Sequence, residues 1–381
     1  ILAASCIRKP STDMKVQTAS DKAKKSRELV FELLLADQPK REVAHDNNSD
    51  FWNWIDKVDL KENRFPKKTP CQPDSSHPSM AVNLDACIQC NLCVRACREV
   101  QVNDVIGMAY RGENSKIVFD FDDPMGDSTC VACGECVQAC PTGALMPASI
   151  VDTKGVGQNK IDKKTESVCP YCGVGCQIEY NVKDNEIKYV NGIDGPANKN
   201  RLCVKGRFGF DYVNNPERLT KPLIRIKGKE KDLHPSINFS NLHEYFREAT
   251  WDEALDHAAN GFLEIKKKRN GKSNLAGFGS AKCSNEEAYL FQKLIRTGFN
   301  TNNVDHCTRL CHASSVAALL ETIGSGAVTA PFYEVEHSEV IIVIGANPTE
   351  NHPVAATFFK NAAKKGSKLI VMDPRGHALK K

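Results

Sequence analysis

Eight of the 17 cysteines lie in two copies of one spacing pattern, and thiolates spaced in this way can bind metal clusters. Each copy has the form C-x2-C-x2-C-x3-C, and Pro141 directly follows the last cysteine of the second copy. This spacing is typical of a protein that holds two 4Fe-4S clusters and passes single electrons through them. The cysteines are Cys87, Cys90, Cys93, Cys97, Cys130, Cys133, Cys136 and Cys140.

The pattern also predicts which cysteines share a cluster. The two runs resemble those of bacterial-type ferredoxins, in which three close thiolates hold one cluster and the fourth cysteine reaches the other cluster. Zinc is the competing metal, but it needs four ligands per site, usually in two separated pairs, so a third close cysteine in each half favours clusters. We expect a first cysteine set of Cys87, Cys90, Cys93 and Cys140, and a second cysteine set of Cys97, Cys130, Cys133 and Cys136.

A third cysteine set consists of Cys169, Cys172, Cys176 and Cys203. Gly173 and Gly175 allow the tight backbone wrap that a 4Fe-4S cluster requires. A zinc ribbon has comparable spacing, so zinc remains an alternative on spacing alone. Lys205 follows Cys203 by two residues and could hold its ammonium group near this set. A solvated surface lysine would fit the same sequence.

Two cysteines and two histidines fall within the seven residues from His306 to His312. A cysteine near a helix N-terminus is a better metal ligand, and an adjacent imidazole can take a proton near neutral pH. Cys311 and His312 could therefore form a reacting centre. From the residues alone, a zinc site or a buried core thiol is an equally good interpretation.

The elements around these residues indicate two kinds of fold. A helix is expected over 22–35, before Asp37 and Pro39, and a strand over 115–121. From Asn274 onward, strands and helices alternate, which is typical of a doubly wound α/β domain that binds ligands at the carboxyl ends of its strands. The predicted strands are 274–279, 339–344 and 368–372, with a helix through 354–363. Capping boxes are expected at Thr250 with Glu253 and at Ser284 with Glu287.

The composition is that of an ordinary folded protein. The chain has 381 residues, 41% of them hydrophobic and 26% charged, with a net charge of +4. A charge so near balance gives no indication of nucleic-acid or membrane-surface binding, and no apolar run is long enough to span a bilayer. Dense cysteine in a chain of this size indicates a reducing compartment, so we expect a cytoplasmic protein.

Several motifs together resemble the molybdenum or tungsten bis-pterin oxidoreductases, and most of all the alpha subunit of NAD-dependent formate dehydrogenase. They are residues 169–176, 202–207, 216–222 and 310–312. The resemblance implies that Cys311 binds Mo or W held by bis-molybdopterin guanine dinucleotide, and that His312 handles the proton. It implies that Lys205 lies between the third cysteine set and the pterin and helps electrons to cross. Cys307 has no such role and is expected to be structural.

The resemblance also places the pterin dinucleotide. Gly345, Asn347, Asp373 and Arg375 follow predicted strands, where a helix N-terminus and an arginine can meet phosphate and an aspartate can meet guanine. Turn chemistry alone would explain each of them. Three further residues are weaker candidates for pterin contact: Ser280, Lys282 and Asn285.

We therefore expect five regions, of class α/β plus α+β. Residues 1–20 would be the remnant of a 2Fe-2S domain and 21–80 a helical or irregular connector. Residues 81–150 would be a ferredoxin-like domain with two 4Fe-4S clusters, and 160–222 the N-terminal 4Fe-4S domain of a bis-pterin oxidoreductase. Residues 223–381 would be an incomplete doubly wound pterin-binding α/β domain. The chain is expected to be a segment of a larger polypeptide that does not turn over alone.

Two departures from the family pattern concern further clusters. Cys6 resembles the last ligand of a plant-type 2Fe-2S domain, whose cluster would form only in the full-length protein. Many relatives hold another cluster with one histidine and three cysteines just before the ferredoxin-like unit. Here that interval contains Cys71, with His45 and His77 nearby, so we expect no such cluster.

The implied reaction is oxidation of formate to CO2, with electrons passing through three 4Fe-4S clusters to a flavin- and NAD-binding partner subunit. A small iron-sulfur subunit could be a second partner. The chain contains no nicotinamide fingerprint, so NAD use depends on the family resemblance. Two other functions remain open: a bis-pterin reductase for another substrate such as nitrate, and an electron-transfer subunit of the respiratory NADH dehydrogenase type.

Overall fold

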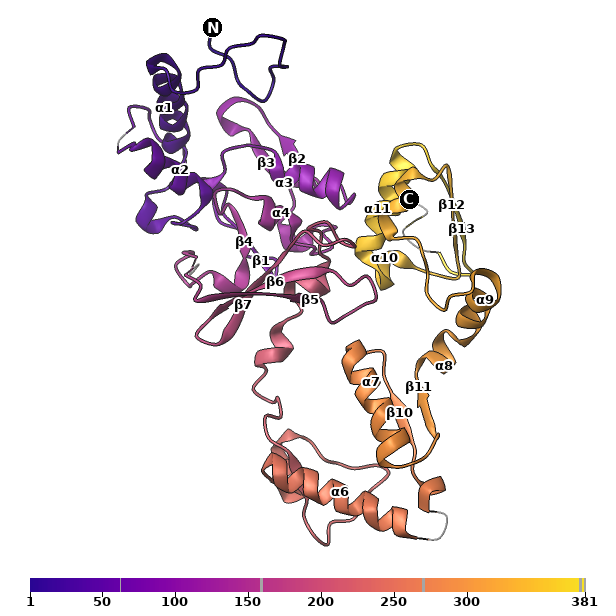
Figure 1. The fold of residues 1–381 in the computed structure, drawn as a ribbon. Helices are drawn as coiled ribbons and strands as arrows, with labels where there is room; N and C mark the ends of the chain where they lie inside the picture. Colours follow the sequence, from indigo (N-terminus) through magenta and orange to yellow (C-terminus); the bar gives the residue numbers. More distant parts are fainter. Residues whose placement is uncertain (62, 158–159, 269–270, 377–378, 380–381) are drawn as a thin grey trace. The chain divides into compact units, whose positions relative to one another are not determined.

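The protein folds as described by a computed structural model, which covers residues 1–61, 63–157, 160–268, 271–376 and 379. Contacts between residues divide the chain into two compact units (Figure 1). The first unit joins residues 1–214 to residues 331–381, and the second comprises residues 215–330. The predicted region 223–381 is thus spread over both units. No helix among the described residues is long and apolar enough to cross a lipid bilayer.

The N-terminal part of the first unit is helical. Helix α1 (Asp21–Ala36) begins at Ser20, whose side chain caps the backbone of Ala23, and the predicted helix over 22–35 is confirmed. Helix α2 (Asp50–Val58) buries one face, including Phe51 and Trp52, in a small hydrophobic cluster. Its last turn closes at Asp59, which has a left-handed φ of 53°.

The next part resembles a ferredoxin in its short helices and paired strands. Strands β1 (Met80–Val82) and β4 (Leu145–Pro147) pair antiparallel, as do β2 (Ile106–Ala109) and β3 (Lys116–Phe119). The strand predicted over 115–121 is confirmed but shorter, because the chain turns at Asp120 with φ 47°. Helices α3 (Leu92–Arg95) and α4 (Glu135–Ala139) each follow a cysteine loop, and a π turn over Ala96–Val100 continues α3.

An antiparallel sheet of three strands follows, in the order β5 (Lys163–Val168), β6 (Gln177–Lys183) and β7 (Glu186–Gly192). Helix α5 (Val204–Phe208) comes after a loop and packs against β7. One face of this sheet shares a hydrophobic cluster with Val354 and Phe358 from near the end of the chain. The 4Fe-4S region and the C-terminal segment therefore form one packed body.

The C-terminal segment of the first unit contains a parallel strand pair. Strands β12 (Val340–Ile344) and β13 (Lys368–Met372) pair parallel along their whole lengths, joined by α10 (Pro348–Asn351) and α11 (Pro353–Lys364). The predicted strand–helix–strand order is confirmed. Only one face of β12 is buried. Ile341 and Val343 are buried against α11, while Ile342 and its neighbours on the other face are exposed.

The second unit contains mainly helices, with two strand pairs. Strands β8 (Leu223–Arg225) and β9 (Phe246–Glu248) pair antiparallel, and β10 (Gly277–Gly279) pairs parallel with β11 (Val304–His306). The helices are α6 (Trp251–Lys267), α7 (Asn285–Lys293), α8 (Thr308–Cys311) and α9 (Ala313–Ile323). A single doubly wound sheet stays a prediction, because the described parallel strands form two separate pairs.

Two predictions about the starts of elements in this unit need correction. The strand expected over 274–279 begins at Gly277, because a 3-10 turn occupies Gly271–Asn274. The capping box of Ser284 and Glu287 is confirmed at the start of α7. At the start of α6, Thr250 caps the helix as expected, but the carboxylate of Glu253 pairs with Arg247 instead of turning back to the cap.

Candidate functional site

The first and second cysteine sets surround two separate cavities in the ferredoxin-like part. One small cavity brings together Cys87, Cys90, Cys93 and Cys140, with Ile117 and Leu145 in its wall. A second small cavity is lined by Cys97, Cys130, Cys133 and Cys136. The fourth cysteine of each run therefore lies with the three cysteines of the other run. This is the grouping that the spacing predicts for two 4Fe-4S clusters, and the four-sulfur lining of each cavity fits such a cluster.

The two cysteine loops have matching backbone conformations. Gln89 and Asn91 have φ values of 55° and 62°, and the corresponding Ala132 and Gly134 have 55° and 70°. Left-handed residues at these places turn backbone N–H groups inward. The N–H of Gln89 lies 3.4 Å from Cys87 Sγ, and that of Ala132 lies 3.3 Å from Cys130 Sγ. Such donors favour negatively charged sulfur, so both loops are shaped for thiolates.

Burial works against free thiolates in these cavities. Removal from water raises the pKa of Cys93 and that of Cys133 to about 12, and it raises the pKa of Cys136 well above its ordinary value. Neighbouring cysteines raise these pKa values too, because negative charges would repel one another. Within the described ranges, no three His, Cys, Asp or Glu side chains are grouped closely enough for a single metal ion. Thiolates are stable in these cavities when the iron of a cluster supplies the positive charge.

The third cysteine set lies beneath the three-stranded sheet. Cys169 and Cys176 belong to the hydrophobic cluster that includes Phe358, and Cys172 and Cys203 pack against it. The backbone N–H of Cys169 bonds to the carbonyl of Cys176 at 2.8 Å, and Gly175 takes a φ of 68° between them. Burial, with a smaller effect of the other three cysteines, raises the pKa of Cys176 to about 12. The four sulfurs thus form one site.

Lys205 connects this site to the C-terminal segment. It lies in α5, two residues after Cys203, and its Nζ is 3.4 Å from the backbone oxygen of Glu350. Burial raises the pKa of Cys169, and the Lys205 ammonium partly opposes that rise. Burial lowers the pKa of His352, and the same ammonium lowers it further. Lys205 therefore lies within electrostatic reach of both the third cysteine set and the loop that follows β12.

The four predicted pterin contacts of the C-terminal segment lie at one edge of the β12–β13 pair. Gly345 has a φ of 60° and donates its N–H to Met372 at the end of β13. Asn347 precedes α10, and its Oδ1 accepts from Thr349 at 2.6 Å. Asp373 accepts from the backbone of Arg375 at 2.8 Å in the loop after β13. Contact of these residues with a dinucleotide stays a prediction.

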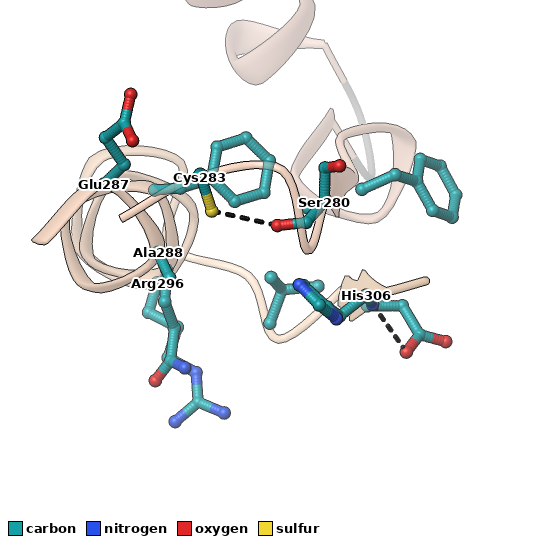
Figure 2. A pocket seen from close by; sticks show the side chains of 12 residues that line it. Ser280, Cys283, Glu287, Ala288, Arg296 and His306 are labelled. Atoms are coloured by element: carbon teal, nitrogen blue, oxygen red, sulfur yellow. Dashed lines mark hydrogen bonds between the residues drawn. The ribbon is translucent and has the colours of Figure 1, made fainter. Parts of the chain in front are cut away.

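A cavity of about 520 Å³ lies in the second unit, at the carboxyl ends of β10 and β11 (Figure 2). Ser280 lines it, as its predicted role in pterin contact requires, and Cys283 Sγ bonds to the backbone oxygen of Ser280 at 2.9 Å. Lys282 is in the same loop and Asn285 begins α7, and both lie outside the described lining. The lining also contains residues that sequence reasoning missed: Cys283, Glu287, Arg296 and His306.

The predicted reacting pair lies elsewhere in this unit. Cys311 ends α8, His312 joins α8 to α9, and both side chains are exposed. The alternative of a buried core thiol is therefore wrong for this structure. The backbone of Ala281 donates to the sulfur of Cys307 at 3.2 Å, which ties the loop after β10 to the start of α8. That contact agrees with a structural role for Cys307.

The residues considered for further clusters have separate surroundings. Cys6 is exposed near the N-terminus. The backbone of Cys71 donates to Asp85 at 2.5 Å. His45 is buried, and burial lowers its pKa, while Nδ1 of His77 accepts from the backbone of Ser79 at 3.1 Å. A 2Fe-2S role for Cys6 stays a prediction for the full-length protein.

Comparison with known proteins identifies three regions. The family model of the 4Fe-4S dicluster domain matches residues 86–144, and that of the molybdopterin oxidoreductase Fe4S4 domain matches residues 162–215. The molybdopterin oxidoreductase family matches residues 218–381. Residues 162–215 and 218–381 therefore belong to the molybdopterin oxidoreductase family. The chain thus contains a 4Fe-4S dicluster domain and two molybdopterin oxidoreductase domains.

Curated relatives resemble nearly the whole chain. "Probable oxidoreductase YjgC" of Bacillus subtilis is 35% identical over 405 residues, covering 96% of this chain and 39% of the relative. A protein of Staphylococcus haemolyticus named as a "Putative formate dehydrogenase" is 34% identical over 376 residues, covering 88% of this chain and 36% of the relative. The chain thus spans less than two-fifths of the length of these family members.

A solved structure also matches part of this chain. It is an NAD+-reducing NiFe hydrogenase in the H2-reduced state, 22% identical, with a TM-score of 0.30. The match covers 34% of this chain and 56% of the hydrogenase chain. A TM-score this low does not establish a shared fold.

Proposed function

We propose that this chain is the iron-sulfur and metal-ligand region of a formate dehydrogenase catalytic subunit. The observation that carries the proposal is the exposed Cys311–His312 pair between two helices, in a chain where twelve further cysteines form three four-sulfur sites. Relatives that are named as formate dehydrogenases support the choice of substrate.

The bound groups would supply two-electron chemistry at Mo or W and one-electron transfer at the clusters. The residues of the chain would position these groups and accept the proton that formate releases. Formate gives CO2, one proton and two electrons. Cys311 would anchor the metal through its thiolate, and His312 would accept the proton at its imidazole. Exposure of both side chains within their unit leaves them free to meet the pterin and the substrate.

The structure supports an order for the electron path. Lys205 would carry the path from the pterin side to the third cysteine set, since its ammonium reaches the loop after β12. The second cysteine set comes next, because Arg207 of α5 contacts the backbone of Cys133 at 3.2 Å. The first cysteine set lies on the side of the N-terminal helices, where Pro141 accepts from the backbone of Phe51 at 3.0 Å.

We propose a flavin- and NAD-binding subunit as the electron acceptor, and a small iron-sulfur subunit as a further partner. A reducing compartment such as the cytoplasm suits the chain, because the proposed clusters need cysteines that are not oxidised to disulfides, and none of the 17 cysteines forms one. A separate NAD-binding subunit also agrees with a sequence that contains no nicotinamide fingerprint.

The test is a substrate comparison with the full-length protein, purified without oxygen. We expect Mo or W at one atom per chain, and dye reduction with formate but no nitrate-dependent oxidation of reduced dye. Nitrate turnover without formate turnover would support the other bis-pterin function. A protein with iron but neither Mo nor W would be an electron-transfer subunit, and the proposal would be wrong.

A further inference from the structure

A buried ion pair joins the second cysteine set to the third. The guanidinium of Arg207 donates to Glu135 Oε1 at 2.6 Å, and the side chains are 2% and 8% exposed. Glu135 begins α4, which carries Cys136. Arg207 lies in α5, four residues after Cys203. The two residues therefore belong to the segments that carry different predicted clusters.

Each partner makes further bonds across the same boundary. Glu135 Oε1 also accepts from the backbone of Leu202 at 2.9 Å, directly before Cys203. Arg207 donates to the backbone oxygen of Cys133 at 3.2 Å and to Gln138 Oε1 at 2.5 Å. Because its planar guanidinium has five N–H donors in a fixed fork, arginine can hold several acceptors at once. Lysine could not reproduce this arrangement.

A second connection reaches the other half of the second cysteine set. Gln101 follows the π turn that carries Cys97, and its amide donates to the backbone oxygen of Leu202 at 2.8 Å. Both segments of the second set are thus fixed to the segment around Cys203. The described bonds of the first cysteine set lead instead to residues such as Ser115 and Phe51.

Stability alone gives a weak reason for such a pair. Taking two charges out of water has a penalty that their attraction often fails to offset, so a buried pair is poor evidence of stabilisation. Fixed geometry is a better reason. Electron tunnelling falls off steeply with distance, and hydrogen bonds around a cluster also tune its reduction potential.

We propose that Arg207 and Glu135 are positioning residues for electron transfer. They fix the second cysteine set at a constant separation from the third, and so set the rate of transfer between the two sites. The inference rests on the proposed function for the source of the electrons. It does not depend on formate being the substrate, because the geometry is the same for electrons from any donor.

The test uses the full-length holoenzyme with Arg207→Met, Arg207→Lys and Glu135→Gln. Glu179→Gln is the matched control, because Glu179 is half-buried and pairs with the exposed Lys164 on the sheet that packs with the third cysteine set. After reduction with dithionite, electron paramagnetic resonance reports the magnetic interaction between the two reduced clusters. Freeze-quench after formate addition reports the time between reduction of the third site and reduction of the second.

We expect Arg207→Met to weaken the magnetic interaction and to slow transfer between the sites about tenfold or more, as outer-shell substitutions do. Arg207→Lys keeps the charge but loses the fork, so transfer stays slow. Glu135→Gln keeps a hydrogen-bond acceptor, so its transfer rate should lie between those of wild type and Arg207→Met. Glu179→Gln matches wild type. If Arg207→Met loses iron, Glu135→Gln alone decides the outcome.

The proposal would be overturned if Arg207→Met left both the magnetic interaction between the clusters and the time between their reduction unchanged. If Arg207→Met loses iron, the same result in Glu135→Gln would overturn it. Reduction with dithionite distinguishes failure of the positioning role from failure of the proposed function, because it does not require formate. A wild-type enzyme that formate cannot reduce would still show the magnetic interaction if the positioning role is right.

Discussion

Lys205 and Glu350 are 145 residues apart in sequence, yet Lys205 Nζ lies 3.4 Å from the backbone oxygen of Glu350. This contact links the helix after Cys203 to the loop after β12. It is possible because Val354 and Phe358 of α11 bury their side chains in the same hydrophobic cluster as Cys169 and Cys176. The predicted pterin loop and the third cysteine set therefore share one rigid support.

Replacing Lys205 tests whether this contact serves electron transfer. We expect Lys205→Met to slow formate-driven reduction of the clusters about 10- to 100-fold, while iron and Mo or W contents stay at wild-type levels. Stopped-flow absorbance of the clusters measures the rate. Lys163→Met, which removes an exposed lysine of β5, is the control and should match wild type. Equal rates in the two variants would remove Lys205 from the path.

Paired cysteine variants test the crossed grouping by counting iron. Cys87→Ser with Cys140→Ser removes two ligands of one predicted cluster, so we expect about four irons per chain to be lost. Cys87→Ser with Cys97→Ser removes ligands of both predicted clusters, so we expect a loss of about eight. If the four cysteines of each sequence run instead shared one cluster, these two results would be reversed. Iron analysis of anaerobically purified protein distinguishes the two patterns.

Gly134 tests the close packing around Arg207. It has a φ of 70°, and a Cβ at this position would lie 2.8 Å from Cγ of Arg207. Gly134→Ala should therefore destabilise the second cysteine set by more than the backbone strain of about 1–2 kcal/mol. Gly112 is the matched control, because its φ is 61° and a Cβ there would have no described atom within 4 Å. Cluster bleaching on heating should occur at a lower temperature in Gly134→Ala than in Gly112→Ala.

His45 gives a pH dependence whose sign follows from its burial. Burial lowers the pKa of His45 in the folded protein, although Gly143, Asp85 and Asp152 partly oppose the shift. The unfolded chain then binds a proton at a higher pH than the folded one does. Stability near His45 should fall as the pH drops below about 6.5, the ordinary value for histidine.

Hydrogen exchange of residues 41–58, corrected for intrinsic rates, measures this local stability. His45→Gln removes the titrating group, so the fall between neutral and mildly acidic pH should become shallower. His234→Gln changes an exposed histidine and is the control. An identical pH profile in His45→Gln and wild type would exclude His45 as the cause.

Local sequence patterns predicted the local features of this chain. The end of α1 near Asp37, the capping box of Ser284 and Glu287, and the strand of Lys368–Met372 all depend on neighbouring residues, and all were confirmed. The pattern at 339–344 predicted a strand but not its exposed face. A run of apolar residues predicts a strand, but it does not indicate which elements cover each face of that strand.

Contacts between distant segments were beyond prediction from one sequence where no motif relates the residues, although the cysteine spacing did predict the crossed grouping. Glu135 and Arg207 are 72 residues apart, and neither has a spacing that relates it to the other. The same holds for the cavity that joins Cys283 to His306, since two different strands bring these residues together. Their position is a result of packing, which a motif does not encode.

Formate-driven cluster reduction in Cys311→Ala tests the central claim most directly. The wild-type full-length enzyme, kept without oxygen, should show reduced-cluster resonances after addition of formate. Cys311→Ala should show none with formate but normal resonances with dithionite, because its three cysteine sets are intact. Reduction of the clusters by formate in Cys311→Ala, at the wild-type rate, would contradict the account.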